Sequence, residues 1–328
     1  QGDARGHHVL RSELAGYLGR VRGVRVSADQ IMVCAGYSHA LALVLQWLKQ
    51  HGRGRLAVED PGLGSNREAV VHFGLSTVDI PVDGHGLEVS RLANANADAV
   101  LVTPAHQFPY GVPLHPSRRS ELLALAERRR MLVIEDDYDG ELRYDRQPVG
   151  AIQGLAPDRV VYVGTTSKSL APTMRLAWLT VPAEMMPELV RFRLLTDRHN
   201  PVIDQLAMAQ LIGSGALDRH LRRVRGRYRA RRETLVRALR TYVPTARILG
   251  VAAGYHITLT FPSTVDEAAV FDRLKDRGIL LDPLSRHTGT ASALGPGLIV
   301  GYGTPPQHQF AAAVEALTTT LATLLPKH

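Results

Sequence analysis

The sequence predicts an α/β protein built on a mainly parallel, doubly wound sheet, followed by a smaller C-terminal α+β domain. Two observations predict the large sheet. Short apolar runs alternate with helical patterns, and these runs are continuous rather than alternating, as in strands that are covered on both faces. A change of pattern after Val181 predicts the second domain, and 328 residues suffice for both.

The first domain is expected over residues 1–200. It begins with an amphipathic helix at residues 7–22, a strand at Gln30–Ala35 and a helix at Ser38–Gln50. Another helix is expected at Pro116–Arg129. The remaining strands are expected in six apolar runs, Arg55–Val58, Ser76–Ile80, Ala99–Thr103, Met131–Glu135, Val160–Gly164 and Leu176–Val181.

The second domain is expected over residues 201–328. A long helical stretch, Ile203–Leu239, opens it. Two apolar runs, Gly254–Phe261 and Leu298–Tyr302, predict strands. Further helices are expected at Val265–Arg277 and Pro306–Leu325.

The composition is that of a globular protein, with 45% hydrophobic and 21% charged residues. The sequence contains no run of about 18 apolar residues, which argues against a membrane span. The polar N-terminus shows no signal peptide. The one cysteine, Cys34, cannot form an intramolecular disulfide, which favours a cytoplasmic location. Because the chain opens on Gln1 rather than methionine, we expect residues upstream.

The net charge of +8 invites a nucleic-acid interpretation. However, the excess is arginine spread along most of the chain, while lysine stands only at Lys49, Lys168, Lys275 and Lys327. The densest basic stretch, Arg219–Arg232, reads as a helix with arginine on several faces. A solvated helix face is therefore favoured over a direct DNA contact.

Ligands of parallel sheets bind beyond the carboxyl ends of the strands, so chemistry is expected near Gly36, Thr103, Asp136 and Thr165. The first of these ends is a glycine-led turn that opens a helix, with Ser38 close behind. Free amide groups at such a helix start, together with a hydroxyl, suit a phosphate. Turns of this kind also occur without a ligand.

The cluster of acidic residues at Glu135–Asp139 follows a buried apolar run. Three interpretations stay open: a solvated turn, a metal site of carboxylates, or one aspartate that pairs with a cationic group. A buried carboxylate needs such a partner to stay ionised.

Lys168 stands among small hydroxyl residues in Thr165–Ser169, just past another buried run, and Arg175 follows. The lysine is either an ordinary solvated residue or one held in a partly desolvated site. In the second case its pKa is lowered and it can form a Schiff base.

Together these features are more specific than any one of them. In this chain order they resemble the fold-type I enzymes that depend on pyridoxal 5′-phosphate. More narrowly, the sequence resembles the aminotransferase-like domain of MocR-type transcription regulators, within the GntR superfamily. The resemblance covers nearly the whole chain and is carried by four blocks, Glu59–Gly62, Thr103–Gly111, Glu135–Tyr144 and Gly164–Arg175.

The resemblance implies a role for each matching residue. Lys168 would hold the cofactor as an internal aldimine and act as the catalytic base, Asp136 would pair with the pyridine nitrogen, and Tyr138 would bond the ring's 3′-oxygen. Leu63 and the loop residues His106 and Gln107 would lie against the ring. The phosphate would be held by Tyr37, Ser38, Thr165 or Ser167, and Arg175.

The sequence also departs from the family pattern. Leu63 stands where relatives carry an aromatic residue that stacks on the ring. The run Leu298–Val300 lacks the arginine that binds a substrate carboxylate in many aminotransferases, and Arg286 is the candidate substitute. Neither the DNA-binding domain of the regulators nor the N-terminal arm of the enzymes precedes Gln1 in this sequence.

Two functions follow from the resemblance. The first is an effector-sensing domain of a transcription regulator, which would recognise an amine or amino acid by forming an external aldimine and would reach DNA only through a missing N-terminal domain. The second is an active aminotransferase of a small amino compound. Both require Lys168, and the resemblance implies a homodimer for either. Which of them holds, and so whether the chain turns over, stays open.

Overall fold

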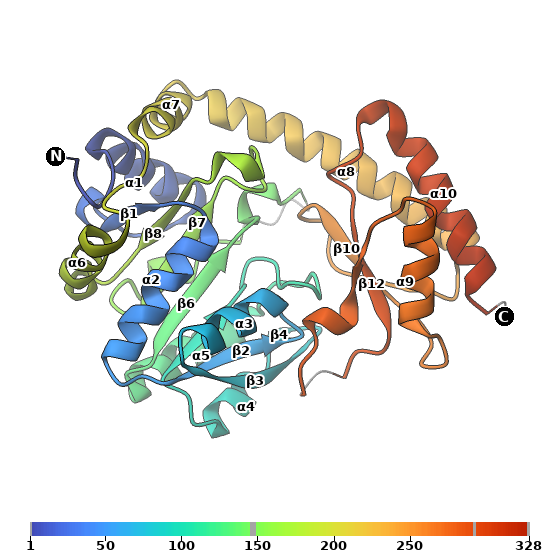
Figure 1. The fold of residues 1–328 in the computed structure, drawn as a ribbon, viewed down its shortest axis with the longest axis horizontal. Coiled ribbons are helices and arrows are strands. Elements are labelled where there is room, and N and C mark those ends of the chain that lie inside the picture. The colour runs from blue at the N-terminus through green and yellow to red at the C-terminus, as the bar shows by residue number, and fades with distance from the viewer. Residues whose placement is uncertain (1, 145–148, 291–292, 327–328) are drawn as a thin grey trace.

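The large sheet has eight strands in the part of the chain that the computed structural model describes, residues 2–144, 149–290 and 293–326 (Figure 1). The strands β7, β6, β5, β2 and β3 run parallel, whereas β8 and β4 are antiparallel to their neighbours. The predicted α/β fold with a mainly parallel sheet is therefore confirmed. In spatial order the strands are β1 (Ile31–Cys34), β8 (Ala177–Thr180), β7 (Val160–Thr165), β6 (Leu132–Asp137), β5 (Ala99–Val102), β2 (Arg55–Asp60), β3 (Ser76–Asp83) and β4 (Gly86–Leu87).

Helices cover both faces of this sheet, which explains its continuous apolar strands. In β6, Ile134 packs with α2 (Tyr37–Gln50), α3 (Gly64–His72) and α6 (Met186–Thr196). Its neighbour Val133 packs on the other face, with α4 (Val89–Asn94) and α5 (Pro116–Arg129). Successive side chains of a strand point to opposite faces, so a strand between two helical layers must be apolar at every position.

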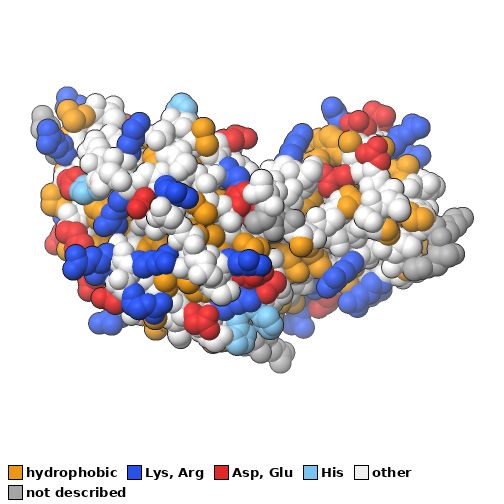
Figure 2. Space-filling view, turned by 90° about the horizontal axis from the view of Figure 1, so that it is seen from below, with side chains coloured by type: hydrophobic (Ala, Val, Ile, Leu, Met, Phe, Trp, Pro, Cys, Tyr) orange, Lys and Arg blue, Asp and Glu red, His pale blue; other side chains and the backbone are white. Residues whose placement is uncertain are grey.

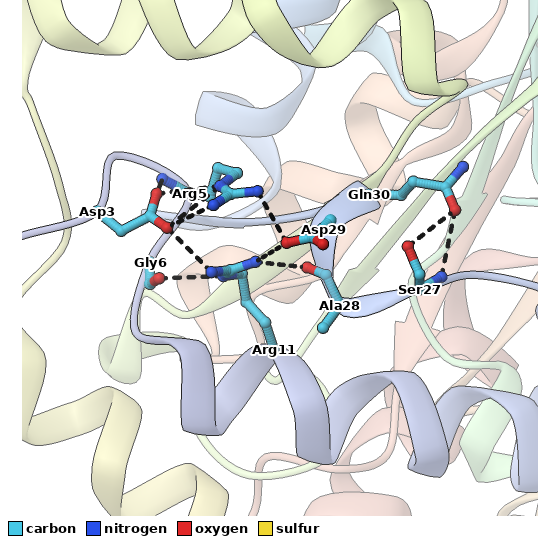
Figure 3. Close-up of polar contacts among 8 residues, drawn as sticks. All are labelled: Asp3, Arg5, Gly6, Arg11, Ser27, Ala28, Asp29 and Gln30. Atoms are coloured by element: carbon cyan, nitrogen blue, oxygen red, sulfur yellow. Dashed lines mark hydrogen bonds and ion pairs between the residues drawn. The ribbon is translucent and has the colours of Figure 1, made fainter.

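The N-terminal segment is tied to the turn before β1 by one buried arginine (Figure 3). Arg11, on α1 (His8–Arg22), is 3% exposed. Its guanidinium donates to the carbonyl oxygens of Gly6 (3.1 Å) and Ala28 (2.6 Å) and to the Asp3 carboxylate (3.0 Å). These bonds satisfy the donors of a charge that would otherwise be costly to bury.

The second sheet is antiparallel, in the order β11 (Asp282–Pro283), β12 (Gly297–Gly301), β10 (His256–Thr260) and β9 (Arg247–Leu249). It packs with α9 (Glu267–Asp276) and α10 (Phe310–Leu324) in one apolar core. The strands and helices predicted between residues 254 and 325 are confirmed, with their ends shifted by a few residues. The domain boundary at residue 200 stays a prediction, and it falls between α6 and α7.

The helical stretch predicted at 203–239 is two helices rather than one. α7 (Val202–Gly213) ends before Gly215, which has a left-handed φ of 66°, and α8 (Ala216–Tyr242) starts immediately after it. Glycine adopts this conformation without steric cost, so the chain turns there. α8 then runs as one long helix from the side of α7 to the side of α10 (Figure 1). The helices α3, α4 and α6 and the strands β4, β9 and β11 were not predicted.

The basic stretch in α8 is not a uniformly solvated face. Arg222, Arg223 and Arg227 are exposed, but Arg231 is 5% exposed and donates to the carbonyl oxygens of Tyr302, Gly303 and Pro305. Elsewhere on the surface, basic and acidic side chains are interspersed, as on the face drawn in Figure 2. Among the described residues, no helix is both long enough and apolar enough to cross a membrane.

Candidate functional site

The carboxyl ends of β2, β5, β6 and β7 meet at a cavity of about 1120 Å³. Its opposite wall comes from the second sheet and from α10. Most residues that the sequence singled out lie on its lining, namely Tyr37, Leu63, Asp136, Tyr138, Thr165, Ser167, Lys168, Arg175 and Arg286. Ser38, His106 and Gln107 do not line it. One cavity thus brings together residues that lie far apart in the sequence.

The acidic residues at the end of β6 and just beyond it divide into separate roles. Glu135 accepts hydrogen bonds from the backbone amides of Ile152 and Gln153, both at 2.9 Å. Asp137 is bound by the buried guanidinium of Arg22, with Nε 2.6 Å from Oδ2. These carboxylates point into the fold, so the cluster is not a single solvated turn.

Asp136 is the acid of this cluster that faces the cavity. It is 5% exposed, and its Oδ1 has no hydrogen-bond partner among the described residues. Burial, and next the neighbouring charge of Asp137, raise the pKa of Asp136 well above its usual range. A cationic group placed in the cavity would reverse this effect and keep the carboxylate ionised.

Lys168 lies in the same cavity, past the end of β7. Its pKa is lowered by burial, against the opposing charges of Asp139 and Asp136. Its Nζ lies 4.8 Å from the centre of the Tyr255 ring. A lysine in this setting is unprotonated more often than a solvated one, which makes it a better nucleophile.

A glycine and an arginine shape the cavity wall at the start of α2. Gly36 precedes the helix with a φ of 89°, and a Cβ built on it would lie 2.5 Å from Nη2 of Arg175. That nitrogen donates to the carbonyl oxygen of Ala35 at 2.9 Å. Across from it, Thr165 Oγ1 donates to Ser167 Oγ at 3.0 Å. Amide donors at a helix start, a guanidinium and two hydroxyls together form a surface suited to a phosphate.

Tyr138, on the cavity lining, contacts the buried His106 behind it. The Tyr138 hydroxyl donates to the carbonyl oxygen of His106 at 2.9 Å, and His106 Nδ1 lies 2.7 Å from Oδ2 of Asp139. Gln107 is also buried, and its amide donates to the carbonyl oxygens of Pro61 (2.8 Å) and Phe108 (2.6 Å). His106 and Gln107 therefore support the loop from behind, while Phe108 lines the cavity.

Arg286 stands at the rim of the cavity. Its side chain is 64% exposed, lies 3.6 Å from a carboxylate oxygen of Asp282, and packs over the ring of Phe271. It is within reach of a ligand, but solvent screens its charge.

The lining residues that were missed in the sequence include Asn66, Phe108, Tyr255 and His256. Asn66 accepts a hydrogen bond from the Tyr37 hydroxyl at 3.2 Å. Tyr255 and His256 come directly after Gly254 at the start of an apolar strand. A polar aromatic pair at a strand end could have marked them.

Sequence comparison decides the family. The family model described as aminotransferase class I and II matches residues 1–292. The chain belongs to this family. Its aminotransferase-like sequence is shared with transcription regulators: it is 33% identical over its whole length to an uncharacterized HTH-type transcriptional regulator, YhdI, of Bacillus subtilis, and covers 70% of that protein. It is 36% identical to the HTH-type pyridoxine biosynthesis transcriptional regulator PdxR of Corynebacterium glutamicum, with 90% of this chain and 63% of the regulator covered.

The fold agrees with the aminotransferase family. The crystal structure of the kynurenine aminotransferase of Pyrococcus horikoshii, solved with PMP, superposes with a TM-score of 0.88 at 25% identity, and covers 99% of this chain and 83% of that one. The predicted fold-type I aminotransferase-like architecture is therefore confirmed, as is the resemblance to MocR-type regulators. The chain corresponds to only part of each regulator, roughly two thirds of its length.

Proposed function

We propose that this chain binds pyridoxal 5′-phosphate on Lys168 and is the ligand-sensing part of a MocR-type transcription regulator. The most direct support is the buried carboxylate of Asp136, whose Oδ1 has no hydrogen-bond partner among the described residues, in the same cavity as a partly buried lysine. A buried carboxylate stays ionised when a cationic group lies beside it, and the protonated pyridine nitrogen of the cofactor is such a group.

The other residues fit the remaining parts of the cofactor. Tyr138 would bond the 3′-oxygen, after turning its hydroxyl from the carbonyl oxygen of His106. Leu63 would cover the ring through its apolar side chain. The phosphate would be held by the start of α2 at Tyr37 and Ser38, by Thr165 and Ser167, and by Arg175. The φ of 89° at Gly36, which L side chains rarely adopt, explains why glycine stands there.

Pyridoxal phosphate, when bound, supplies an aldehyde that condenses with primary amines and a protonated ring that accepts electrons. The residues of the chain attach the cofactor and move the protons. Lys168 attaches the cofactor and moves a proton at the Cα of the bound amine, and its lowered pKa favours the unprotonated amine that both steps need. Asp136 keeps the ring nitrogen protonated.

Sensing is favoured over turnover because the regulators match along most of this chain. Their DNA-binding function would belong to a segment outside residues 1–328. The cavity also offers no buried arginine for a substrate carboxylate on the wall of the second sheet, within the described residues. The aminotransferase alternative keeps its support from the retained Lys168 and from the likeness to the kynurenine aminotransferase. A cytoplasmic location stays a prediction.

An absorbance spectrum with added pyridoxal phosphate tests the cofactor assignment. The wild type is expected to develop a visible band that Lys168→Ala lacks, because the amine that attaches the cofactor is gone. Lys275→Ala removes an exposed lysine from α9 and is expected to keep the band. A folded wild type without the band would contradict the proposal. Amine titrations then separate the two functions, since turnover releases a keto or aldehyde product and sensing does not.

A homodimer is also proposed, on the basis of an apolar surface where α6 ends and α7 begins. Its exposed side chains include Leu195 (76% exposed) and Ile203 (81% exposed), with Leu194, Val202 and Leu206 beside them in the sequence. Exposed apolar residues gathered in this way mark association surfaces.

Ile203→Glu is expected to shift the protein from dimer to monomer in sedimentation experiments, because the change buries a charge in the interface. Leu155→Glu alters another exposed leucine, 67% exposed, in a turn after β6, and is expected to leave the dimer intact. A wild type that sediments as a monomer, or an unchanged dimer in Ile203→Glu, would refute this assignment of the surface.

A further inference from the structure

Two buried polar side chains that line the cavity contain atoms without a hydrogen-bond partner among the described residues. One is Asp136, at Oδ1, and the other is His256, at both ring nitrogens. The proposed function accounts for Asp136 through the cofactor's ring nitrogen. It leaves the imidazole of His256 without a role, although this side chain is only 3% exposed. Buried polar groups in folded proteins nearly always have a partner, so His256 calls for one.

The position of His256 is well defined by its neighbours. It is the first residue of β10, opposite Gly301 of β12. Its ring centre lies 5.2 Å from those of His106 and Phe108 and 5.4 Å from that of Tyr255. These rings enclose the imidazole on several sides and leave it little freedom to turn elsewhere for a partner.

Two protein groups near the imidazole have hydrogen-bond partners elsewhere. The carbonyl oxygen of Pro109 lies close to the imidazole, but accepts its hydrogen bond from the Thr258 hydroxyl. His106 Nδ1 is bound to Asp139, at 2.7 Å. Because His256 lines the cavity and neither ring nitrogen has a hydrogen-bond partner among the described residues, a ligand in the cavity is within reach of the imidazole.

The imidazole is neutral at physiological pH, because burial lowers the pKa of His256 well below its ordinary value and the charges of His106 and Lys168 act in the same direction. A neutral imidazole donates one hydrogen bond and accepts one. It therefore suits a neutral group that can do both, such as a hydroxyl, better than a carboxylate, which only accepts.

His256 also lies close to the reacting position. Tyr255 bridges the two, since Lys168 Nζ is 4.8 Å from the centre of the Tyr255 ring and the His256 ring is the next one along the wall. The second sheet contributes the apolar side chains of Ile299 and Val300 of β12 to the lining, and the acidic Asp282 of β11. A ligand whose amine takes the place of Lys168 Nζ would thus extend along a largely apolar wall, with His256 as a polar contact.

We propose that His256 is the ligand-recognition residue of this cavity, and that it selects primary amines carrying a hydroxyl or a similar neutral group that both donates and accepts a hydrogen bond. This inference rests on the proposed function, since the amine must first meet the cofactor on Lys168. It adds the chemical class of the ligand and the residue that reads it.

The test titrates the visible band of the cofactor-bound protein with pairs of amines that differ by one hydroxyl in place of a methyl group. The pairs are ethanolamine with propylamine, and propanolamine with butylamine. The wild type is expected to bind the better amino alcohol about tenfold more tightly than its isostere, the difference made by one buried hydrogen bond. His256→Phe keeps a ring but removes the bond, so its preference is expected to fall to about onefold.

Two further variants keep the result interpretable. His256→Gln retains a hydrogen-bond donor and an acceptor and is expected to keep part of the preference for the amino alcohol. If His256→Phe does not fold, His256→Leu replaces it as the variant without the hydrogen bond. His85→Phe makes the same change at an exposed histidine and is expected to keep the full preference.

The outcomes separate the two proposals. A wild type that forms the band but shows no preference, or a His256→Phe variant that keeps it, overturns the role of His256 alone. A folded wild type that forms no band refutes the cofactor assignment, and the role of His256 falls with it. A preference that is lost in His256→Phe and kept in His85→Phe supports the inference.

Discussion

Asp136→Asn is expected to weaken pyridoxal phosphate binding by about 2–5 kcal/mol, the usual loss when one partner of a buried charge pair is removed. The asparagine side chain has nearly the same shape but cannot offset the positive ring nitrogen. The same change is expected to leave the cofactor-free protein at least as stable as the wild type, because it removes a buried carboxyl whose Oδ1 has no partner among the described residues. Equilibrium titration and thermal unfolding measure the two effects separately.

The stability of the cofactor-free protein is expected to depend on pH through Asp136. In the cofactor-free protein the pKa of Asp136 is raised by burial and by Asp137, so the folded chain binds a proton that the unfolded chain has released. The free energy of unfolding therefore falls as the pH rises from the ordinary carboxyl range through the raised value. Asp136→Asn lacks this contribution, so the stability of the variant relative to the wild type should increase with pH across that window.

Asp276→Asn makes the same change at an exposed aspartate and serves as the control. It is expected to alter neither the cofactor affinity nor the pH dependence. Equal cofactor affinity in the wild type and Asp136→Asn would mean that the carboxylate does not contact the ring nitrogen.

Arg22→Met is expected to destabilise the folded protein by about 3–5 kcal/mol, because it leaves Asp137 buried without its cation. The side chains of this pair are only 4% and 1% exposed. Arg22 also donates to the carbonyl oxygen of Val149 at 2.8 Å, and the Tyr162 hydroxyl donates to Asp137 at 2.7 Å. The pair thus connects α1, β6 and β7 directly beneath Asp136.

Urea unfolding of the cofactor-free protein measures this loss. The neighbouring Arg20, whose side chain is 57% exposed and pairs with Asp218, provides the matched control, and Arg20→Met is expected to cost no more than about 1 kcal/mol. Adding Asp137→Asn to Arg22→Met should recover part of the stability, since the uncompensated charge is then gone. If Arg20→Met and Arg22→Met lowered stability equally, the buried pair would have no special role.

The large sheet could be predicted because its strands are buried on both faces and therefore read as short apolar runs. β6 and β7 were found for this reason. The acids at the end of β6 and the lysine that follows β7 marked their carboxyl ends. β4 and β11, with two residues each, have no such pattern. α3 was missed because no side chain caps its start and only two of its residues, Asn66 and Val70, are buried. It therefore lacks both the capping signal and the apolar pattern of a helix.

Within the site, the sequence could indicate which strand ends carry chemistry but not which atom of a cluster faces the cavity. Four acidic residues stand at the end of β6 and just beyond it. Only the packing of Arg22, His106 and the amides of residues 152–153 shows that Asp136 is the acid that faces the cavity. His256 was missed for a related reason. Its distance from Lys168 in the sequence is large, and only the packing of the second sheet against the first brings the two to one cavity.

The unbroken length of α8 has a mechanical consequence. A helix of 27 residues is about 40 Å long, and it behaves as a stiff rod. It starts at Gly215, where the chain turns, and reaches α10 and the second sheet at its far end. A rotation of about 5° at that glycine would carry the distal end through about 3.5 Å. α8 thus joins the turn at Gly215 to the ligand cavity, which Leu235 on its distal half lines.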